Sequence, residues 1–134
     1  MAKPKITWEI ETYGIYTGWD KESKKLPQVV KHTQTIPARI GIEFGYILSI
    51  KKAKGKKLSF CIDHPSFCDE WGNVMPPFTG EVYVRANQWE FFLGDTIWEP
   101  VHDKVGDWRL TISMDGQILS DKTFQVVSDE DGMV

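Results

Sequence analysis

Cysteine is scarce in this chain, and no long apolar run interrupts its 134 residues. The two cysteines, Cys61 and Cys68, lie close together, and we expect reduced thiols because no signal peptide precedes them. No segment approaches the length of a membrane span. These absences predict a cytoplasmic protein that associates with no membrane and whose fold is stabilised by its core alone.

A strong excess of one charge is also missing, because the formal net charge is −3. A protein that binds nucleic acid needs a broad basic face, so we expect no nucleic-acid partner. One cluster of lysines surrounds Gly55 without any aromatic residue between its members, which favours a solvated hairpin turn. The cluster consists of Lys51, Lys52, Lys54, Lys56 and Lys57.

Common catalytic and cofactor motifs are absent as well. The chain has no Gly-x-Ser-x-Gly nucleophile elbow, no Gly-x-Gly-x-x-Gly turn and no phosphate-binding Gly-x4-Gly-Lys loop. We therefore expect a protein that is not an enzyme, with no catalytic residue and no cofactor.

The clearest structural signal is present at residues 106–127. Trp108, Leu110, Ile112 and Met114 alternate with polar residues, and the same period returns after Asp115-Gly116. An alternation of period two indicates a half-buried strand, and an Asp-Gly pair supplies the left-handed backbone of a two-residue hairpin turn. These features predict an antiparallel hairpin in a sandwich of two sheets.

Strand-like patterns also cover most of the remaining chain. The first is expected to end before Gly14, and Gly41 and Gly45 indicate a bulge or a close backbone approach. The expected strands are 6–11, 28–35, 40–50, 58–62, 82–86 and 89–93, besides the terminal hairpin. We predict an all-β, immunoglobulin-like antiparallel sandwich of seven to eight strands, with one domain at 1–127 and an acidic flexible tail at 128–134.

Two long loops, Asp63–Gly80 and Gly94–Gly106, contain most of the candidate binding residues. Long loops in a compact domain commonly carry function, and exposed rings beside carboxylates can anchor a protein partner or stack on sugars. A competing interpretation is that Trp71 or Trp98 covers the core beside Trp108. The candidates are Phe67, Glu70, Trp71, Phe78, Trp98, Glu99 and Asp103.

A weaker candidate site consists of Cys61, His64 and Cys68. Two thiols and an imidazole could bind zinc or form a thiol enzyme, but a tetrahedral zinc site would need His32 or His102 as a fourth ligand. The alternative is that Cys61 lies within a strand, on the face opposite its apolar neighbours, as a small side chain without chemistry.

Three segments resemble one bacterial family. Ile36–Gly45 has the pattern Ile-Pro-Ala-x-x-Gly-x-x-Phe-Gly, and Glu11–Tyr16 and Trp98–Val101, followed by Gly106–Trp108, also fit. The chain is similar there to the family called domain of unknown function 3859. The resemblance implies one small immunoglobulin-like domain, and it assigns no catalytic residue or cofactor.

Together these features predict a non-catalytic module that binds a macromolecular partner, most simply a protein. The contact would be made through the long loops or through an open sheet edge, whose unpaired N–H and C=O groups can accept a partner strand. A carbohydrate-binding module that uses the loop tryptophans is the first alternative. A metal- or thiol-dependent enzyme around Cys61 is the second.

Overall fold

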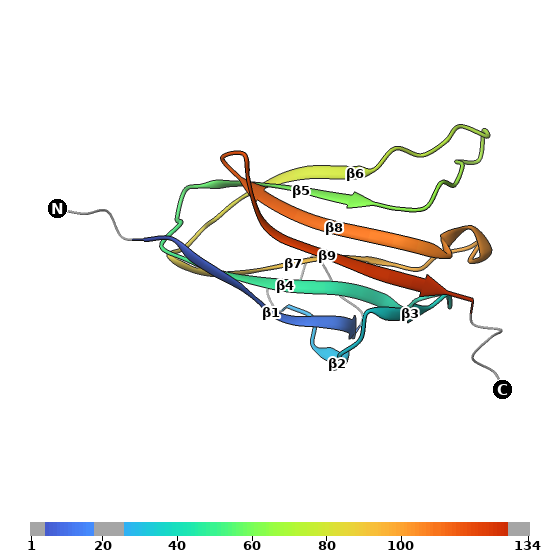
Figure 1. The fold of residues 1–134 in the computed structure, drawn as a ribbon, viewed down its shortest axis with the longest axis horizontal. Helices are drawn as coiled ribbons and strands as arrows, with labels where there is room; N and C mark the ends of the chain where they lie inside the picture. The colour runs from blue at the N-terminus through green and yellow to red at the C-terminus, as the bar shows by residue number, and fades with distance from the viewer. Residues whose placement is uncertain (1–4, 18–25, 129–134) are drawn as a thin grey trace.

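The computed structural model describes residues 5–17 and 26–128, which form two sheets packed face to face (Figure 1). One sheet has the order β2-β1-β4-β7 and the other the order β3-β9-β8-β5-β6. The strands are β1 (Thr7–Tyr16), β2 (Val29–Lys31), β3 (Thr35–Pro37), β4 (Glu43–Lys51), β5 (Lys57–Asp63), β6 (Phe78–Tyr83), β7 (Gln88–Thr96), β8 (Gly106–Met114) and β9 (Gln117–Val127). A short 3-10 helix, η1 (His102–Lys104), precedes β8. The predicted all-β, immunoglobulin-like sandwich is confirmed.

The terminal hairpin forms as predicted. β8 and β9 pair antiparallel, with Trp108, Leu110 and Ile112 fully buried between the sheets. Asp115 and Gly116 have φ values of 51° and 81°, the left-handed backbone that this two-residue turn requires.

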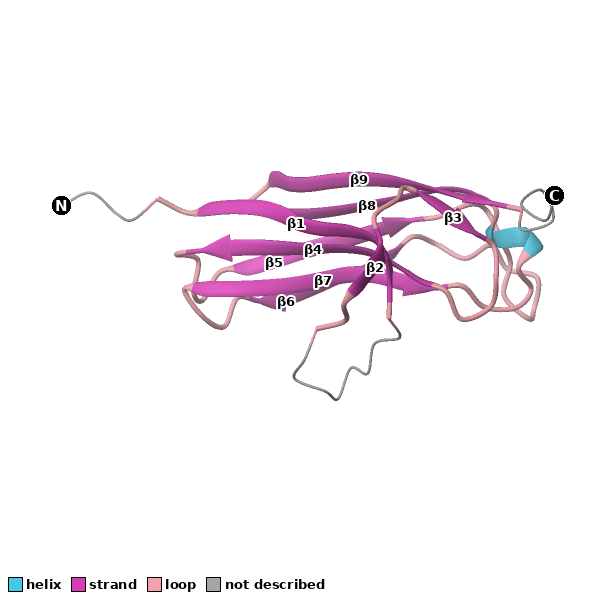
Figure 2. Ribbon diagram, turned by 90° about the horizontal axis from the view of Figure 1, so that it is seen from below, coloured by secondary structure: helices cyan, strands magenta, loops and turns pink. Residues whose placement is uncertain are grey.

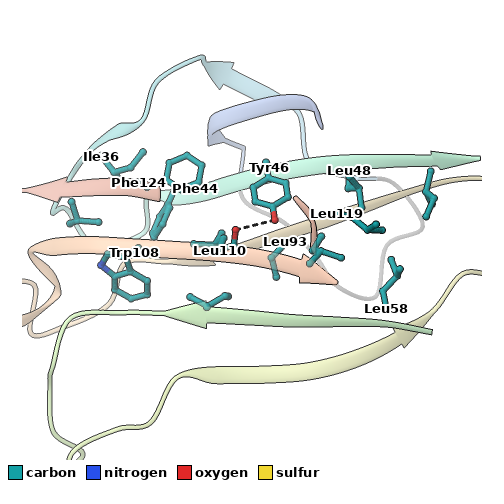
Figure 3. Packing of buried hydrophobic residues seen from close by; sticks show 14 of the residues in the cluster. Ile36, Phe44, Tyr46, Leu48, Leu58, Leu93, Trp108, Leu110, Leu119 and Phe124 are labelled. Carbon is teal, nitrogen blue, oxygen red and sulfur yellow. Dashed lines mark hydrogen bonds between the residues drawn. The ribbon is translucent and has the colours of Figure 1, made fainter. Parts of the chain in front are cut away.

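The core fills the space between β4, β7, β8, β9 and β5 with large apolar side chains (Figure 3). Tyr46 is the one phenol at its centre, and its hydroxyl donates to the carbonyl oxygen of Leu110 at 3.2 Å and lies 2.8 Å from the Ser120 hydroxyl. Burial raises the pKa of Tyr46, so the ring remains neutral at any ordinary pH. These hydrogen bonds satisfy a buried polar group that would otherwise destabilise the core.

Four details of the expected strands differ in the structure. The described strands number nine, and β3 pairs with β9 in parallel, so the sandwich is not purely antiparallel. Residues 28–35 do not form one strand, because the chain crosses there from the four-stranded sheet (β2) to the five-stranded sheet (β3). β1 does not end before Gly14 but continues to Tyr16.

β1 continues through Gly14, a position at which the neighbouring backbone leaves no room for a side chain. Gly14 pairs with Gly45 of β4, and a Cβ on Gly14 would overlap the backbone oxygen of Lys31 in the neighbouring strand. A Cβ on Gly45 would likewise overlap the backbone of Leu93 in β7. The close backbone approach predicted at Gly45 is therefore confirmed, and glycine marks strand contact here instead of a strand end.

Both long loops are shorter than expected, because the strands beside them extend further. β6 begins at Phe78. Gly80 of β6 pairs with Phe60 of β5, and the Phe60 ring occupies the space that a Cβ on residue 80 would take. β7 continues to Thr96, whose hydroxyl donates to the Glu43 carboxylate at 2.9 Å across the sheet. The loops that remain are residues 64–77 and 97–105.

Other predictions concern the ends and turns of the chain. The five lysines around Gly55 are all exposed, and Lys57 forms an ion pair with Glu81 at 2.8 Å. No helix in the described ranges is long and apolar enough to cross a membrane. The predicted acidic tail lies outside the described residues from position 129 onward.

Candidate functional site

The two loops meet at one end of the sandwich, where β5 and β7 end and β6 and β8 begin (Figure 1). A groove of about 510 Å³, here called the end groove, lies between them. Figure 2 shows η1 and the loops gathered at this same end. The lining residues are Phe67, Cys68, Asp69, Glu70, Trp71, Met75, Trp98, Glu99, Pro100, Asp103 and Lys104.

The inner wall of the end groove is an aromatic cluster continuous with the core. The Trp98 ring lies edge-on to Trp108 at 6.2 Å and to Phe67 at 5.5 Å, measured between ring centroids. Trp98 thus covers the core beside Trp108, as one of the two sequence interpretations predicted. Phe67, only 5 % exposed, and Phe78, a partly buried strand residue, are also packing residues, so neither is an exposed ring.

Lys104 closes the floor of this cluster, although sequence reasoning did not select it. Its side chain is 1 % exposed, and its ammonium group lies 4.6 Å from the Phe67 ring centroid and 4.4 Å from that of Trp98. The ammonium donates to the Asp103 carboxylate and to the carbonyl oxygen of Pro100. A buried charge is tolerated only with such partners, so this lysine holds loop 97–105 against the cluster.

The main chain at Lys104 is fixed from the core side. Trp108 Nε1 donates to the carbonyl oxygen of Lys104 at 2.8 Å, within the turn that η1 makes before β8. The indole N–H would otherwise be an unsatisfied buried donor. The same contact therefore satisfies Trp108 and sets the position of the loop.

Trp71 is the exception among these aromatic residues, with 78 % of its surface exposed. It lies at the tip of a small hairpin closed by the Cys68–Val74 bridge and by the hydrogen bond from Met75 N to Phe67 O at 2.9 Å. Asp69 Oδ1 accepts the N–H groups of Trp71 and Asn73, each at 2.9 Å. The exposed ring is therefore presented on an ordered turn.

Backbone donors around Asp69 also shift its protonation. The N–H of Asn73 has the largest effect, and with that of Trp71 it lowers the pKa of the Asp69 carboxyl below its usual range. The turn is stabilised by the charged form, which is present throughout the neutral range.

Acidic groups dominate the charge of the end groove. Asp69, Glu70, Glu99 and Asp103 line it together with one cation, Lys104, which is already bonded to Asp103. Glu70 and Glu99 are exposed, and neither takes part in an ion pair among the described residues. The outer part of the groove thus combines a flat ring with unneutralised carboxylates.

The structure does not assemble Cys61, His64 and Cys68 into a metal site. In the described ranges no three His, Cys, Asp or Glu residues are close enough to hold a metal ion, and neither His32 nor His102 joins the set. Both cysteines are free thiols, and Cys61 lies in β5 on the face opposite the buried Ile62. Burial raises the pKa of Cys61, which disfavours the reactive thiolate.

His64 has a packing role. Its ring stacks on Phe67 at 4.2 Å between centroids, and its two nitrogens lie 2.8 Å from the carbonyl oxygens of Pro65 and Pro76. It thereby links the two ends of loop 64–77.

Comparison with known proteins supports the fold and the family. A crystal structure of an immunoglobulin-like protein from Pseudomonas aeruginosa superposes with a TM-score of 0.74 at 21 % identity, covering 95 % of this chain and 100 % of that one. At this identity the similarity shows the fold alone. No curated protein matches the chain. A family profile, however, matches residues 4–126, and the chain accordingly belongs to the family described as domain of unknown function 3859.

Proposed function

We propose that this domain is a non-catalytic binding module that holds a segment of a partner protein in the end groove. The observation that supports it most directly is Trp71, a large ring 78 % exposed on an ordered turn. Exposed tryptophan is unfavourable in an isolated soluble protein, and tryptophan is enriched among the residues that dominate binding energy at interfaces.

The position of Trp71 matters as much as its exposure. The ring lines a groove whose other wall, Trp98 and Phe67, is fixed by the core. A rigid wall facing an exposed ring loses little conformational entropy when a ligand binds. Val74, 65 % exposed on the same hairpin, extends the apolar surface beyond the groove.

The charges of the groove indicate the chemistry of the partner. Glu70 and Glu99 lack a cationic partner within the described residues, whereas the ammonium of Lys104 already shows how this end accommodates a cation between rings and a carboxylate. A lysine or arginine side chain from a partner would repeat that arrangement on Trp71, with its charge near Glu70 or Glu99. The proposed ligand is therefore a protein segment with a basic residue flanked by apolar ones.

The test compares binding by the wild type with that of two single variants. Trp71→Ala removes the exposed ring of the groove, and Tyr83→Ala removes an exposed ring, 61 % accessible, from β6. Proteins captured from a lysate of the source organism are identified, purified and titrated against all three forms. We expect Trp71→Ala to lower the affinity at least tenfold and Tyr83→Ala to leave it within about twofold, as hot-spot energetics imply.

Charge variants and sugars complete the test. Glu70→Gln with Glu99→Gln should weaken the same complex and reduce its dependence on salt. Equal affinity of wild type and Trp71→Ala for every purified partner would overturn the proposal. Quenching of tryptophan emission by neutral oligosaccharides, lost in Trp71→Ala, would replace it with the carbohydrate-binding alternative.

A further inference from the structure

A second surface of the molecule, the outer edge of β7, differs from the other sheet edges. β7 is the end strand of the four-stranded sheet, and β4 is its one partner among the described strands. Of the other end strands, β2 and β3 have three residues each and β6 has six, whereas β7 has nine. β2 and β3 pair with only the ends of β1 and β9, but the rest of β1 contains a bulge and the rest of β9 contains Lys122. β2 also contains a lysine and β3 a proline, but β7 has no Lys, Arg or Pro.

Those features of the short edges are the usual protection against pairing with other chains. β7 lacks them, and its pairing with β4 runs along its whole length without a bulge. A straight, long edge of this kind is a template for another strand.

The direction of the backbone groups follows from the antiparallel pattern. Hydrogen bonds from Lys52 N to Asn87 O and from Ile97 N to Ile42 O flank the β4–β7 ladder. Since bonded positions alternate along an antiparallel strand, the odd-numbered residues of β7 bond to β4. The N–H and C=O groups of Gln88, Glu90 and Gly94 are therefore directed away from β4, toward the open edge.

A hollow of about 390 Å³ follows the same edge. Its lining includes residues from both faces of β7, since Phe91 and Leu93 pack with the core while Phe92 packs with a separate cluster on the outer face. Phe60 and Phe78 of the other sheet form the opposite wall. A space that reaches both faces of one strand is where the alternating side chains of a neighbouring strand would lie.

The charges of this edge select among partner strands. The two carboxylates that line the hollow, Glu43 and Asp95, already accept hydrogen bonds from Thr96, so the charge considered for a partner is that of Glu90. Glu90 lies on the same strand, and a hydrogen bond with Glu90 is the main effect that raises the pKa of Glu11 in β1. Lys51 already lies near this pair and acts in the opposite direction, and a further cationic side chain from a partner would stabilise both carboxylates.

We infer that the edge of β7 is a strand-addition site for an extended segment of a partner protein, in which apolar residues alternate with lysine or arginine. The apolar side chains would enter the hollow beside Phe60 and Phe91, and the basic ones would lie on the outer face near Glu90. Backbone hydrogen bonds to Gln88, Glu90 and Gly94 would supply the pairing. This site is independent of the end groove, because none of these residues lines that groove.

The experiment uses three synthetic nonapeptides and the full chain. One alternates Lys and Val, one alternates Glu and Val, and one repeats the Lys/Val sequence with N-methyl groups at every second residue to block the ladder. We expect the first to slow hydrogen exchange at the amides of Gln88, Glu90 and Gly94 and to bind at least tenfold more tightly than the other two. Similar binding of the N-methylated peptide, or none of the Lys/Val peptide at millimolar concentration, would overturn the inference.

Two variants at one position separate the backbone from the charge. Glu90→Pro removes an N–H that faces the edge, a change that edge strands tolerate, and Glu90→Gln removes only the charge. We expect a loss of at least tenfold for the proline variant and about two- to threefold for the glutamine variant, with thermal melting to confirm that both are folded. Equal affinity of all three forms would exclude strand addition at β7.

The remaining controls address other occupants of the edge. In Trp71→Ala, which removes the exposed ring of the end groove, the Lys/Val peptide should still slow exchange at the amides of Gln88, Glu90 and Gly94 and still bind more tightly than the N-methylated peptide. Binding at the end groove, which accepts the same chemistry, and binding at β7 therefore give different results. A dimer in sedimentation, with the β7 amides already protected in the free protein, would show that a second copy covers the edge and would overturn the partner inference.

Discussion

At the end of the sandwich where the two loops meet, an inner and an outer half both combine aromatic rings with charged groups, but the inner half is buried and the outer half is exposed. In the inner half the rings of Phe67 and Trp98 lie over the ammonium of Lys104, and Trp108, which contacts both rings, is fully buried. In the outer half Trp71 is 78 % exposed, and the charges of Glu70 and Glu99 have no described ion-pair partner. The comparison teaches that the inner half closes the sandwich, whereas the exposed ring of the outer half adds little to the core.

The largest loss of stability is expected when the innermost ring, that of Trp108, is removed. Trp108→Ala deletes a fully buried indole and leaves a cavity, so the free energy of unfolding should fall by about 3–5 kcal/mol. A urea titration followed by far-UV circular dichroism measures the change. Because whole domains are stable by only about 5–15 kcal/mol, this variant should be the least stable of the set. A loss below about 1 kcal/mol would mean that Trp108 does not support the core.

A smaller loss is expected for the buried cation. Lys104→Met keeps the apolar stem beside Phe67 and Trp98 but leaves the Asp103 carboxylate and the Pro100 carbonyl oxygen without their donor. We expect about 2–3 kcal/mol of destabilisation in the same titration. The matched control is Lys57→Met, which removes an exposed lysine paired with Glu81 and should leave the urea midpoint almost unchanged. Equal midpoints for the two variants would contradict a structural role for Lys104.

Sequence alone predicted the part of this end that follows a regular period. Trp108 alternates with polar neighbours along β8, so its burial was visible in the pattern, and the Asp115-Gly116 turn was equally plain. Lys104 gave no such signal, because lysine is seldom buried and the rings that surround it come from two separate loops.

The sequence indicates candidate binding residues in both loops, but it does not show that the two loops meet. It depends on which strands neighbour each other, and β5 and β7 belong to different sheets. The sequence pattern places Phe78 in a loop, because Gly80 interrupts the alternation of apolar and polar residues along β6. The Phe60 ring, which packs over Gly80, comes from a different strand. Local patterns thus define single strands, whereas a site made from several elements requires the topology.

Trp71→Ala should change stability far less than either buried substitution. The ring is exposed, so the expected loss is under about 1 kcal/mol, while binding at the end groove should fall strongly. The urea midpoints of this variant and Trp108→Ala, measured side by side, test the division between the halves directly. A midpoint as low as that of Trp108→Ala would place Trp71 in the core and remove the main support for the proposed site.

The smallest effect concerns the turn that presents Trp71, and it depends on pH. Because hydrogen bonds from the N–H groups of Asn73 and Trp71 lower the pKa of Asp69, the folded turn binds a proton less readily than the unfolded chain. The stabilisation is therefore complete above the ordinary aspartate value of about 4 and is lost as the pH falls through the lowered value. In an NMR titration the Trp71 and Asn73 amides should shift with a midpoint below that ordinary value, while the amides of β8 remain native. Asp69→Ala should abolish this transition, and a midpoint above about 4 in the wild type would contradict the hydrogen-bonded turn.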